Sequence, residues 1–398
     1  MRFTYFMYNE RLDEQILTSQ VFKLWTDYVK KYTDSDVEII VFQNIFHYFL
    51  NYRAGLILKN DFNLINIKIY PFALPTRGFF LNSFFLGIHK LLFKASSIVF
   101  KNKIVISRGY LASYILTQKA KFNTISDLRS LFVRENIGVR WKLNSREFKN
   151  WLEIEKNILE LSKAIITVNN SMSNYLESEY INNKSKISVI PIYTSNSFVK
   201  NNSDLSSKNK INLFYVGSLG KSKWNDIDVY LDFFRSISNY SNKEIFKVIL
   251  IFKDENTYTN LLVNFLKSSG LDYSIFFNLK HEEVIDKMKF SDIGLILARP
   301  FDDASCRTGI KSIEYISNNL TLLASSCLTD VKELVESNDI GFVIEDVKLN
   351  EIEIHNIINN FIKKSSYFKS NVSKLYNEKF SKERLLKQYS DLLNSVST

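Results

Sequence analysis

The stretch IGLILARPFDDASCRTGIKSIEYISNNLTLLAS, residues 293–325, contains two short apolar runs separated by a polar loop and an amphipathic segment. The runs 293–298 and 320–325 have the length and the Ile and Leu content of buried strands. Between them, residues 308–317 carry apolar side chains at helical spacing. A strand, a helix and a second strand joined this closely form a βαβ unit, so the stretch predicts a parallel sheet.

The same alternation of apolar runs and amphipathic segments extends over the rest of the chain. Residues 193–210, rich in Ser, Asn and Lys, interrupt it and are typical of a linker. Further strands are predicted at 2–8, 37–42, 64–70, 103–107, 122–126, 164–168, 187–191, 211–217, 246–252, 273–278 and 341–345. Further helices are predicted at 13–32, 80–97, 109–120, 147–162, 170–180, 226–240, 256–268, 281–289, 329–337 and 351–365.

The length of the chain predicts more than one domain. At 398 residues it exceeds the size at which a single hydrophobic core stops growing. We predict an α/β protein with two Rossmann-like, doubly wound parallel-sheet domains, at 1–200 and 206–378, and a last helix at 380–398 that packs back on the first. Such sheets bind ligands at the carboxyl ends of their strands, so the two domains are expected to face a cleft. Two unrelated α/β domains in tandem are the alternative.

The composition excludes several classes of protein. Two cysteines and four histidines show no ligand spacing, so no metal site, cofactor or disulfide framework is expected. The N-terminus does not resemble a signal peptide, and the most apolar stretch, 78–88, is too short and polar to span a bilayer. We therefore expect a cytoplasmic protein, soluble or peripheral on the inner face of the plasma membrane. The net charge of +10 favours phosphorylated substrates or an anionic membrane, and no nucleic-acid motif accompanies it.

A glycine-containing turn follows the strand predicted at 211–217. Gly217, Ser218 and Gly220 would let backbone amides approach an anion closely, and the predicted helix that follows adds partial positive charge. Lys221 and Lys223 lie beside the turn and would neutralise a diphosphate. An ordinary tight turn is the other interpretation of this segment.

Lys311 and Glu314 lie three residues apart near the start of the helix predicted at 308–317, and so share one face. A carboxylate in this position can accept hydrogen bonds from both hydroxyls of a ribose, and the nearby lysine can contact a phosphate. A solvated ion pair between the two residues is the other interpretation.

These segments resemble the retaining glycosyltransferases of family 4, which have the GT-B fold. The stretch RTGIKSIEY, 307–315, is similar to their donor-site helix, and Asp330 stands at the Asp position of a later loop. In the first half, ISRGYLA, 106–112, resembles their strand-end Arg segment. The sequence DLR, 127–129, with Glu135 after it, resembles their Asp-x-Arg-Gly…Glu stretch.

The resemblance implies a retaining, metal-independent transfer of a hexose or related sugar from a nucleotide sugar. The implied acceptor is a lipid-linked or other saccharide in surface polysaccharide synthesis, such as O-antigen or capsule. The catalytic roles fall on Arg129, Glu135 and Lys311. Donor binding falls on Gly217, Ser218, Lys221, Lys223, Arg307, Thr308, Gly309, Glu314 and Asp330, and the acceptor side on Arg108 and Asp127.

Some positions depart from the family pattern. Arg307 stands where many members have an acidic residue, Ser130 where Gly is usual, and 317–322 lacks the usual Gly and Pro. A nucleotide-sugar-binding scaffold subunit and a GT-B-related epimerase are therefore alternatives. The aromatic, basic stretch 77–103 is expected either to lie on an anionic membrane or to pack on the first sheet.

Overall fold

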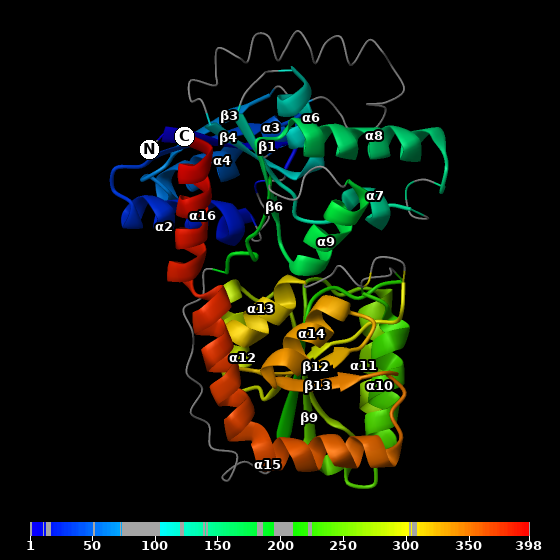
Figure 1. Cartoon of the computed structure of the whole chain (residues 1–398). Coiled ribbons are helices and arrows are strands. Elements are labelled where there is room, and N and C mark those ends of the chain that lie inside the picture. Colours follow the sequence, from blue (N-terminus) through cyan, green and yellow to red (C-terminus); the bar gives the residue numbers. More distant parts are fainter. Residues whose placement is uncertain are drawn as a thin grey trace. The chain divides into compact units, whose positions relative to one another are not determined.

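The computed structural model describes residues 2–10, 12, 17–50, 52–71, 73, 104–119, 123–137, 140, 142–180, 186–194, 210–221, 225–301, 304 and 309–397. The chain divides into two compact units, Met1–Ser195 with Leu385–Thr398, and Asn196–Arg384. Each unit contains one parallel sheet (Figure 1).

The first unit is built on a seven-stranded sheet of order β3-β2-β1-β4-β5-β6-β7. Its strands are β1 (Arg2–Tyr8), β2 (Asp36–Phe42), β3 (Asn66–Tyr70), β4 (Ile104–Arg108), β5 (Asn123–Asp127), β6 (Ala164–Thr167) and β7 (Ile187–Val189). Its helices are the π-helical η1 (Thr18–Lys23), α2 (Leu24–Lys31), α3 (Ile45–Leu50), α4 (Tyr52–Asp61), α6 (Gly109–Lys119), α7 (Phe132–Glu135), α8 (Arg146–Leu161), α9 (Asn170–Glu179) and α16 (Lys382–Ser397). Every neighbouring pair of strands is parallel.

The side chains of β1 alternate between two cores, one on each face of the sheet. Phe3 and Tyr5 pack with residues of η1, α2 and α16, whereas Phe6 packs on the other face with α6. Trp25 of α2 packs edge to face on Tyr389 of α16, with ring centroids 5.1 Å apart. The ring of Phe3 packs on Trp25 in the same way, with centroids 5.0 Å apart. The last helix of the chain is therefore part of the first core, and Figure 1 shows it beside α2.

The second unit is built on a six-stranded parallel sheet of order β10-β9-β8-β11-β12-β13. Its strands are β8 (Ile211–Val216), β9 (Phe246–Phe252), β10 (Asp272–Phe277), β11 (Ile293–Ile296), β12 (Thr321–Ser325) and β13 (Gly341–Ile344). Its helices are α10 (Ile227–Asn239), the 3-10 turn η4 (Lys243–Ile245), α11 (Thr257–Ser269), α12 (His281–Lys289), α13 (Ile310–Ser317), α14 (Thr329–Asn338), α15 (Glu351–Leu375) and the π-helical η6 (Tyr376–Phe380).

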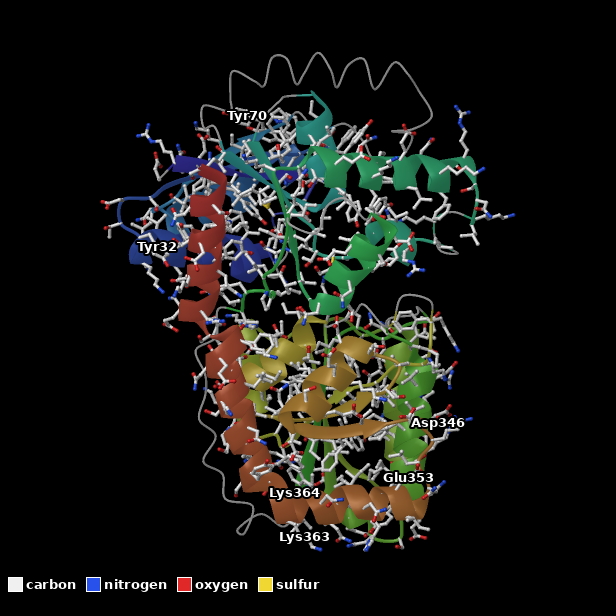
Figure 2. The ribbon with its side chains drawn as sticks, viewed as in Figure 1. Tyr32, Tyr70, Asp346, Glu353, Lys363 and Lys364 are labelled. Carbon is white, nitrogen blue, oxygen red and sulfur yellow. The ribbon has the colours of Figure 1, made fainter. Side chains whose placement is uncertain are left out.

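The central strand β8 again serves two cores. Leu213 and Tyr215 pack with α10, α11 and the first half of α15, whereas Phe214 points to the other face and meets Tyr315 of α13. On the outer side of α15, Lys363 and Lys364 are exposed and point away from the sheet (Figure 2).

The prediction of two Rossmann-like parallel-sheet units is confirmed. Each predicted strand is present, with ends within two residues of those predicted. Helices α3, α4 and α7 were not predicted, and α15 continues to Leu375 because Phe368, Val372 and Leu375 extend its buried stripe. The helix predicted at 80–97 lies outside the described residues. Among the described residues, none of the helices combines the length and apolarity that crossing a membrane requires.

A buried carboxylate joins three helices of the first unit. Glu155 of α8 is 1% exposed and accepts hydrogen bonds from the hydroxyls of Tyr110, 2.6 Å away, and Tyr180, 3.0 Å away. Tyr110 belongs to α6 and Tyr180 ends α9. Burial raises the pKa of Glu155 from 4.5 to about 7, although the two hydroxyls oppose the shift.

This raised pKa predicts a pH-dependent stability. Because the folded protein binds the Glu155 proton more tightly than the unfolded chain does, the contribution is fully present below pH 4.5 and is lost as the pH rises to about 7. Across this window the loss amounts to about 3 kcal/mol. Urea unfolding over a pH series should show a flatter profile for Glu155→Gln than for the wild type. The exposed Glu153→Gln on the same helix is the control. Parallel profiles for wild type and Glu155→Gln would contradict the expectation.

Candidate functional site

The second sheet changes its winding direction between β8 and β11. From β8 the chain continues to β9 and β10 on one side, whereas β11 leads to β12 and β13 on the other. The two strands are direct neighbours, with Leu213 paired to Ile293. Doubly wound sheets bind ligands at the carboxyl ends of the strands at such a point. A ligand site is therefore expected at the loops after β8 and β11.

The loop after β8 begins at Gly217, where neighbouring side chains leave no room for a Cβ. Gly217 has a φ of 150°, and a Cβ built there would lie 2.6 Å from Nζ of Lys311. Its N–H donates to the carbonyl of Ile251 at 3.0 Å, and the Tyr215 hydroxyl donates to the carbonyl of Ser218 at 2.9 Å. Any larger residue at 217 would displace the lysine.

The ammonium group of Lys311 lies against this turn. Its Nζ donates to the Tyr215 hydroxyl at 3.2 Å and lies 4.4 Å from the centre of the Tyr215 ring. These contacts hold the charge beside Gly217 without neutralising it, because the phenol is uncharged. No ion pair links Lys311 and Glu314, both of which the structure describes, so their spacing does not reflect the solvated ion pair considered above.

Tyr315 fixes α13 against the sheet. Its hydroxyl accepts a hydrogen bond from the N–H of Val216 at 3.3 Å, and its ring packs edge to face on Phe214. A Cβ at Gly294 of β11 would lie 2.3 Å from that ring. The missing side chain at Gly294 therefore lets α13 approach β8 and β11 closely, which places the two charged residues of α13 at the strand ends.

Glu314 lies one helical turn beyond Lys311 and is half-buried. Among the described residues, its carboxylate has no hydrogen-bond or ion-pair partner. Burial raises its pKa to about 7, and the charge of Lys311 offsets part of this shift. A desolvated carboxylate is costly without hydrogen-bond donors, so Glu314 is suited to receive them from a ligand.

The start of α13 has no side-chain cap. Gly309 occupies the N-cap position, and the Ser312 hydroxyl donates back to its carbonyl at 2.8 Å. Gly309 thus supplies none of the side-chain acceptors that Ser, Thr, Asp or Asn at the N-cap would offer to the first amides of α13. This end of the helix can attract a negative group.

The start of α10, in contrast, already carries a carboxylate. Asp226 is its N-cap and accepts a hydrogen bond from the N–H of Asp228 at 3.1 Å. Lys221 forms an ion pair with Asp228 on the surface. The positive charge beside Gly217 therefore comes from Lys311 rather than from α10 or Lys221.

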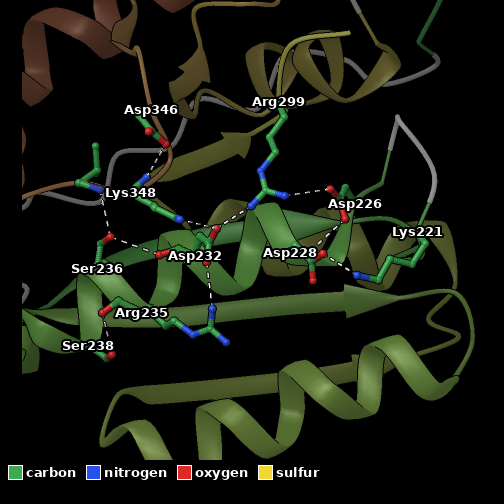
Figure 3. Close-up of polar contacts among 11 residues, drawn as sticks. Lys221, Asp226, Asp228, Asp232, Arg235, Ser236, Ser238, Arg299, Asp346 and Lys348 are labelled. Atoms are coloured by element: carbon green, nitrogen blue, oxygen red, sulfur yellow. Dashed lines mark hydrogen bonds and ion pairs between the residues drawn. The ribbon is translucent and has the colours of Figure 1, made fainter.

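Arg299, in the loop after β11, ties that loop to α10 (Figure 3). Its guanidinium lies 2.6 Å from a carboxylate oxygen of Asp232 and 3.5 Å from one of Asp226. Asp232 also pairs with Arg235 at 2.9 Å and Lys348 at 3.7 Å. This cluster holds the two loops that leave β8 and β11 at a fixed separation.

The structure describes only some of the other predicted donor residues. Asp330 lies in the first turn of α14 and is buried. Lys223, Arg307 and Thr308 lie outside the described residues. The structure thus brings together Gly217, Ser218, Lys311 and Glu314, with Gly309 at the start of the same helix.

In the first unit, the predicted Asp127 and Arg129 form a buried ion pair. The Asp127 carboxylate is fully buried, 2.6 Å from Nη2 of Arg129, and accepts a hydrogen bond from the Tyr5 hydroxyl at 2.8 Å. Arg129 also donates to the Tyr389 hydroxyl of α16 at 3.3 Å. Burial by itself lowers the pKa of the Arg129 guanidinium, but Asp127, Tyr389 and Tyr5 together outweigh burial and raise that pKa. These contacts give both residues a structural role.

Arg108 lies at the end of β4, next to β5. It donates to the side-chain oxygen of Gln20 at 3.0 Å and pairs with Glu10 at 3.6 Å. One of its terminal nitrogens, like two guanidinium nitrogens of Arg129, has no hydrogen-bond partner in the structure. Glu135 is half-buried at the end of α7. The partnerless nitrogens are buried, and the side chains of Arg108 and Arg129 are only 9% and 13% exposed.

Two contributors to the second-unit site were missed from the sequence. Tyr215 could have been found, because it precedes Gly217 by two residues and so lies on the same side of β8. No local signal marks Arg299, since its partners lie 67 and 73 residues away. Among the described residues, no group of three or more His, Cys, Asp or Glu side chains is placed to hold a metal ion.

Solved structures similar to this chain over its whole length include glycosyltransferases. Anabaena Alr3699/HepE in complex with UDP matches with a TM-score of 0.66 and 14% identity, covering 99% of this chain and 100% of that one. A Rickettsia africae glycosyltransferase matches with a TM-score of 0.66 and 13% identity, covering 100% and 99%. The chain has the GT-B fold.

A third structure with the GT-B fold, the apo form of the lipopolysaccharide outer core galactosyltransferase WaaB, matches with a TM-score of 0.66 and 12% identity over 99% of both chains. No family model and no curated protein matches the sequence. At these identities the likeness establishes the GT-B fold alone.

Proposed function

We propose that the chain is a glycosyltransferase that takes its sugar from a nucleotide sugar bound at the ends of β8 and β11. The observation that carries this proposal is the pairing of an unneutralised lysine beside Gly217 with a carboxylate that lacks a partner among the described residues. HepE, which shares the fold, was crystallised with UDP and with UDP-glucose.

Different residues of the second-unit site would contact different parts of the donor. The N–H of Gly217 is already bonded, but those of Ser218 and Leu219 carry no bond to a described residue and are available to a phosphate. Lys311 supplies a positive charge beside them. Glu314, one turn along α13, would accept hydrogen bonds from the two ribose hydroxyls.

The transfer forms a bond between an acceptor hydroxyl oxygen and the anomeric carbon and breaks the bond from that carbon to a phosphate oxygen. The electron pair of the broken bond leaves with the nucleoside diphosphate, and the hydroxyl proton is released. Lys311 and the uncapped start of α13 would stabilise that developing charge. We propose that the reaction retains the anomeric configuration and that Asp330 and residues 307–309 complete the donor site.

For the first unit we propose the acceptor role. Arg108 ends β4 and Arg129 follows β5, so both place positive charge at the carboxyl ends of neighbouring strands, which supports an anionic acceptor such as a lipid-linked saccharide carrying phosphate. Glu135 stays a predicted catalytic residue. The place in surface polysaccharide synthesis belongs to the same proposal. The stretch 77–103, predicted to contact a membrane or the sheet, lies outside the described residues.

Incubation with UDP-, GDP-, ADP- and CMP-sugars and a saccharide acceptor tests this function. Release of the nucleotide together with a glycosylated product is expected for one donor class. Nucleotide binding without any transfer or hydrolysis would instead identify a scaffold subunit.

Transfer is expected to continue in the presence of EDTA. The ammonium group of Lys311 would lie beside the leaving diphosphate, so the protein itself would neutralise the negative charge of the diphosphate. The product should form at the same rate with and without the chelator. Loss of activity with EDTA, restored by Mn²⁺ or Mg²⁺, would show that Lys311 does not carry this role.

A further inference from the structure

An apolar surface lies on α3 and α4 of the first unit. We define the α3–α4 surface by six large side chains that are between 45% and 80% exposed, Ile45, Phe46, Phe49, Leu50, Leu56 and Ile57. Helix α3 buries none of its six residues. Soluble proteins rarely leave so many large apolar side chains on adjoining helices without a partner.

The surface is presented by a firmly attached element. Leu58 of α4 is buried in the first core, and a Cβ at Gly55 would lie 2.7 Å from the Ile69 side chain of β3. Helix α4 therefore packs closely on the sheet edge through one side. Leu56 and Ile57 lie on its exposed side, and α4 contacts α3.

The residues between 45 and 60 that are charged at neutral pH are all positive. Between residues 45 and 60 the sequence contains Arg53 and Lys59, both exposed, and His47, but no acidic residue. Asp61 is the first carboxylate, at the end of α4. Large aliphatic and aromatic side chains flanked by Lys and Arg are typical of helices that insert into the headgroup region of an anionic bilayer.

A second copy of the chain fits this surface less well. A two-fold contact would bring the same patch of each copy together, and so place Arg53 and Lys59 near their own equivalents. Within α3 and α4 no carboxylate before Asp61 could offset that repulsion. An anionic bilayer, in contrast, complements both the apolar side chains and the charges.

We infer that the α3–α4 surface docks the protein on an anionic lipid bilayer. This inference adds a partner to the proposed function, since a membrane-bound enzyme meets a lipid-linked acceptor directly. The benefit of docking rests on the proposed function. The experiment that tests docking does not, because membrane binding is measured without donor or acceptor.

Flotation with vesicles made of equal parts phosphatidylglycerol and phosphatidylcholine, or of phosphatidylcholine alone, tests the docking. The wild type is expected to float with the anionic vesicles and to be released by high salt. The double variant Phe46→Ser/Phe49→Ser should bind roughly tenfold less or weaker still, because both rings would otherwise be buried in lipid. Ile352→Ser, at an equally exposed position of α15, should bind like the wild type.

Two double variants with the same change in net charge test the contribution of the positive charges to binding. Arg53→Glu/Lys59→Glu should weaken binding, whereas Lys363→Glu/Lys364→Glu, which changes the net charge equally on the exposed side of α15, should not (Figure 2). Equal loss in both would show that net charge, not this surface, carries the binding. That result would overturn the inference.

Three further outcomes would also overturn it: no flotation of the wild type, unchanged flotation of Phe46→Ser/Phe49→Ser, or a dimer in light scattering that this variant dissociates. Donor turnover with a soluble acceptor separates the two proposals. A variant that turns over donor normally but no longer floats supports the docking. A wild type that floats but never turns over donor contradicts the proposed function alone.

Discussion

Replacing Glu314 with alanine is expected to lower nucleotide-sugar affinity by roughly 100-fold and to reduce transfer at least as much. Two hydrogen bonds from ribose hydroxyls to a carboxylate contribute about 3 kcal/mol, and each 1.4 kcal/mol corresponds to tenfold. The carboxylate has no described partner in the free protein, so little else is lost with it. Calorimetric titration and steady-state kinetics measure the two effects.

The pH dependence provides a check specific to the carboxylate. Because burial raises the pKa of Glu314 to about 7, the ionised form that accepts two hydroxyl hydrogen bonds gains population as the pH rises through 7. Affinity for a nucleotide sugar should increase over that range in the wild type and stay flat in Glu314→Gln. Glu333→Ala, on the exposed side of α14, is the control. Wild-type affinity in Glu314→Ala would remove this residue from the site.

Arg129→Ala is expected to destabilise the first unit by about 3–5 kcal/mol, because it leaves the fully buried Asp127 carboxylate without its cation. A loss of this size lowers the melting temperature by about 10 °C in a unit of this length. It also removes the hydrogen bond to Tyr389, which links α16 to the sheet. Thermal unfolding followed by calorimetry measures the change.

An exposed ion pair in the same sheet serves as the control. Arg2 and Asp36 lie 2.9 Å apart with side chains 75% and 58% exposed, so Arg2→Ala should cost at most about 1 kcal/mol. An Arg129→Ala protein that melts like the wild type yet fails in transfer would show that Arg129 acts on the substrate rather than on the fold.

The strands and the fold class followed from the sequence because parallel strands buried on both faces appear as uninterrupted apolar runs. Helix α13 also followed, together with the shared face of Lys311 and Glu314. Helices α3 and α4 did not, because residues 45–50 are apolar all round and show no helical stripe. The six side chains of the α3–α4 surface are exposed, against the usual rule that links such residues to the core.

The contacts that define the candidate site could be predicted only in part. The turn at Gly217 and the charged pair on α13 are local features, but their meeting depends on Tyr315 packing over Gly294, which joins two distant segments. The family resemblance gave Asp127 and Arg129 roles at the site, but it did not predict that they are buried against Tyr5 and Tyr389. Those partners lie 122 and 260 residues away in the chain.

The central claim is that a nucleoside diphosphate binds where Lys311 meets Gly217. Calorimetric titration of the wild type and of Gly217→Val with UDP, GDP and ADP tests it most directly. We predict one bound nucleotide per chain in the wild type, and no detectable binding in Gly217→Val, where a side chain would occupy the position of the lysine ammonium. A wild type that binds none of the three, or a Gly217→Val protein that binds as tightly as the wild type, would contradict the account.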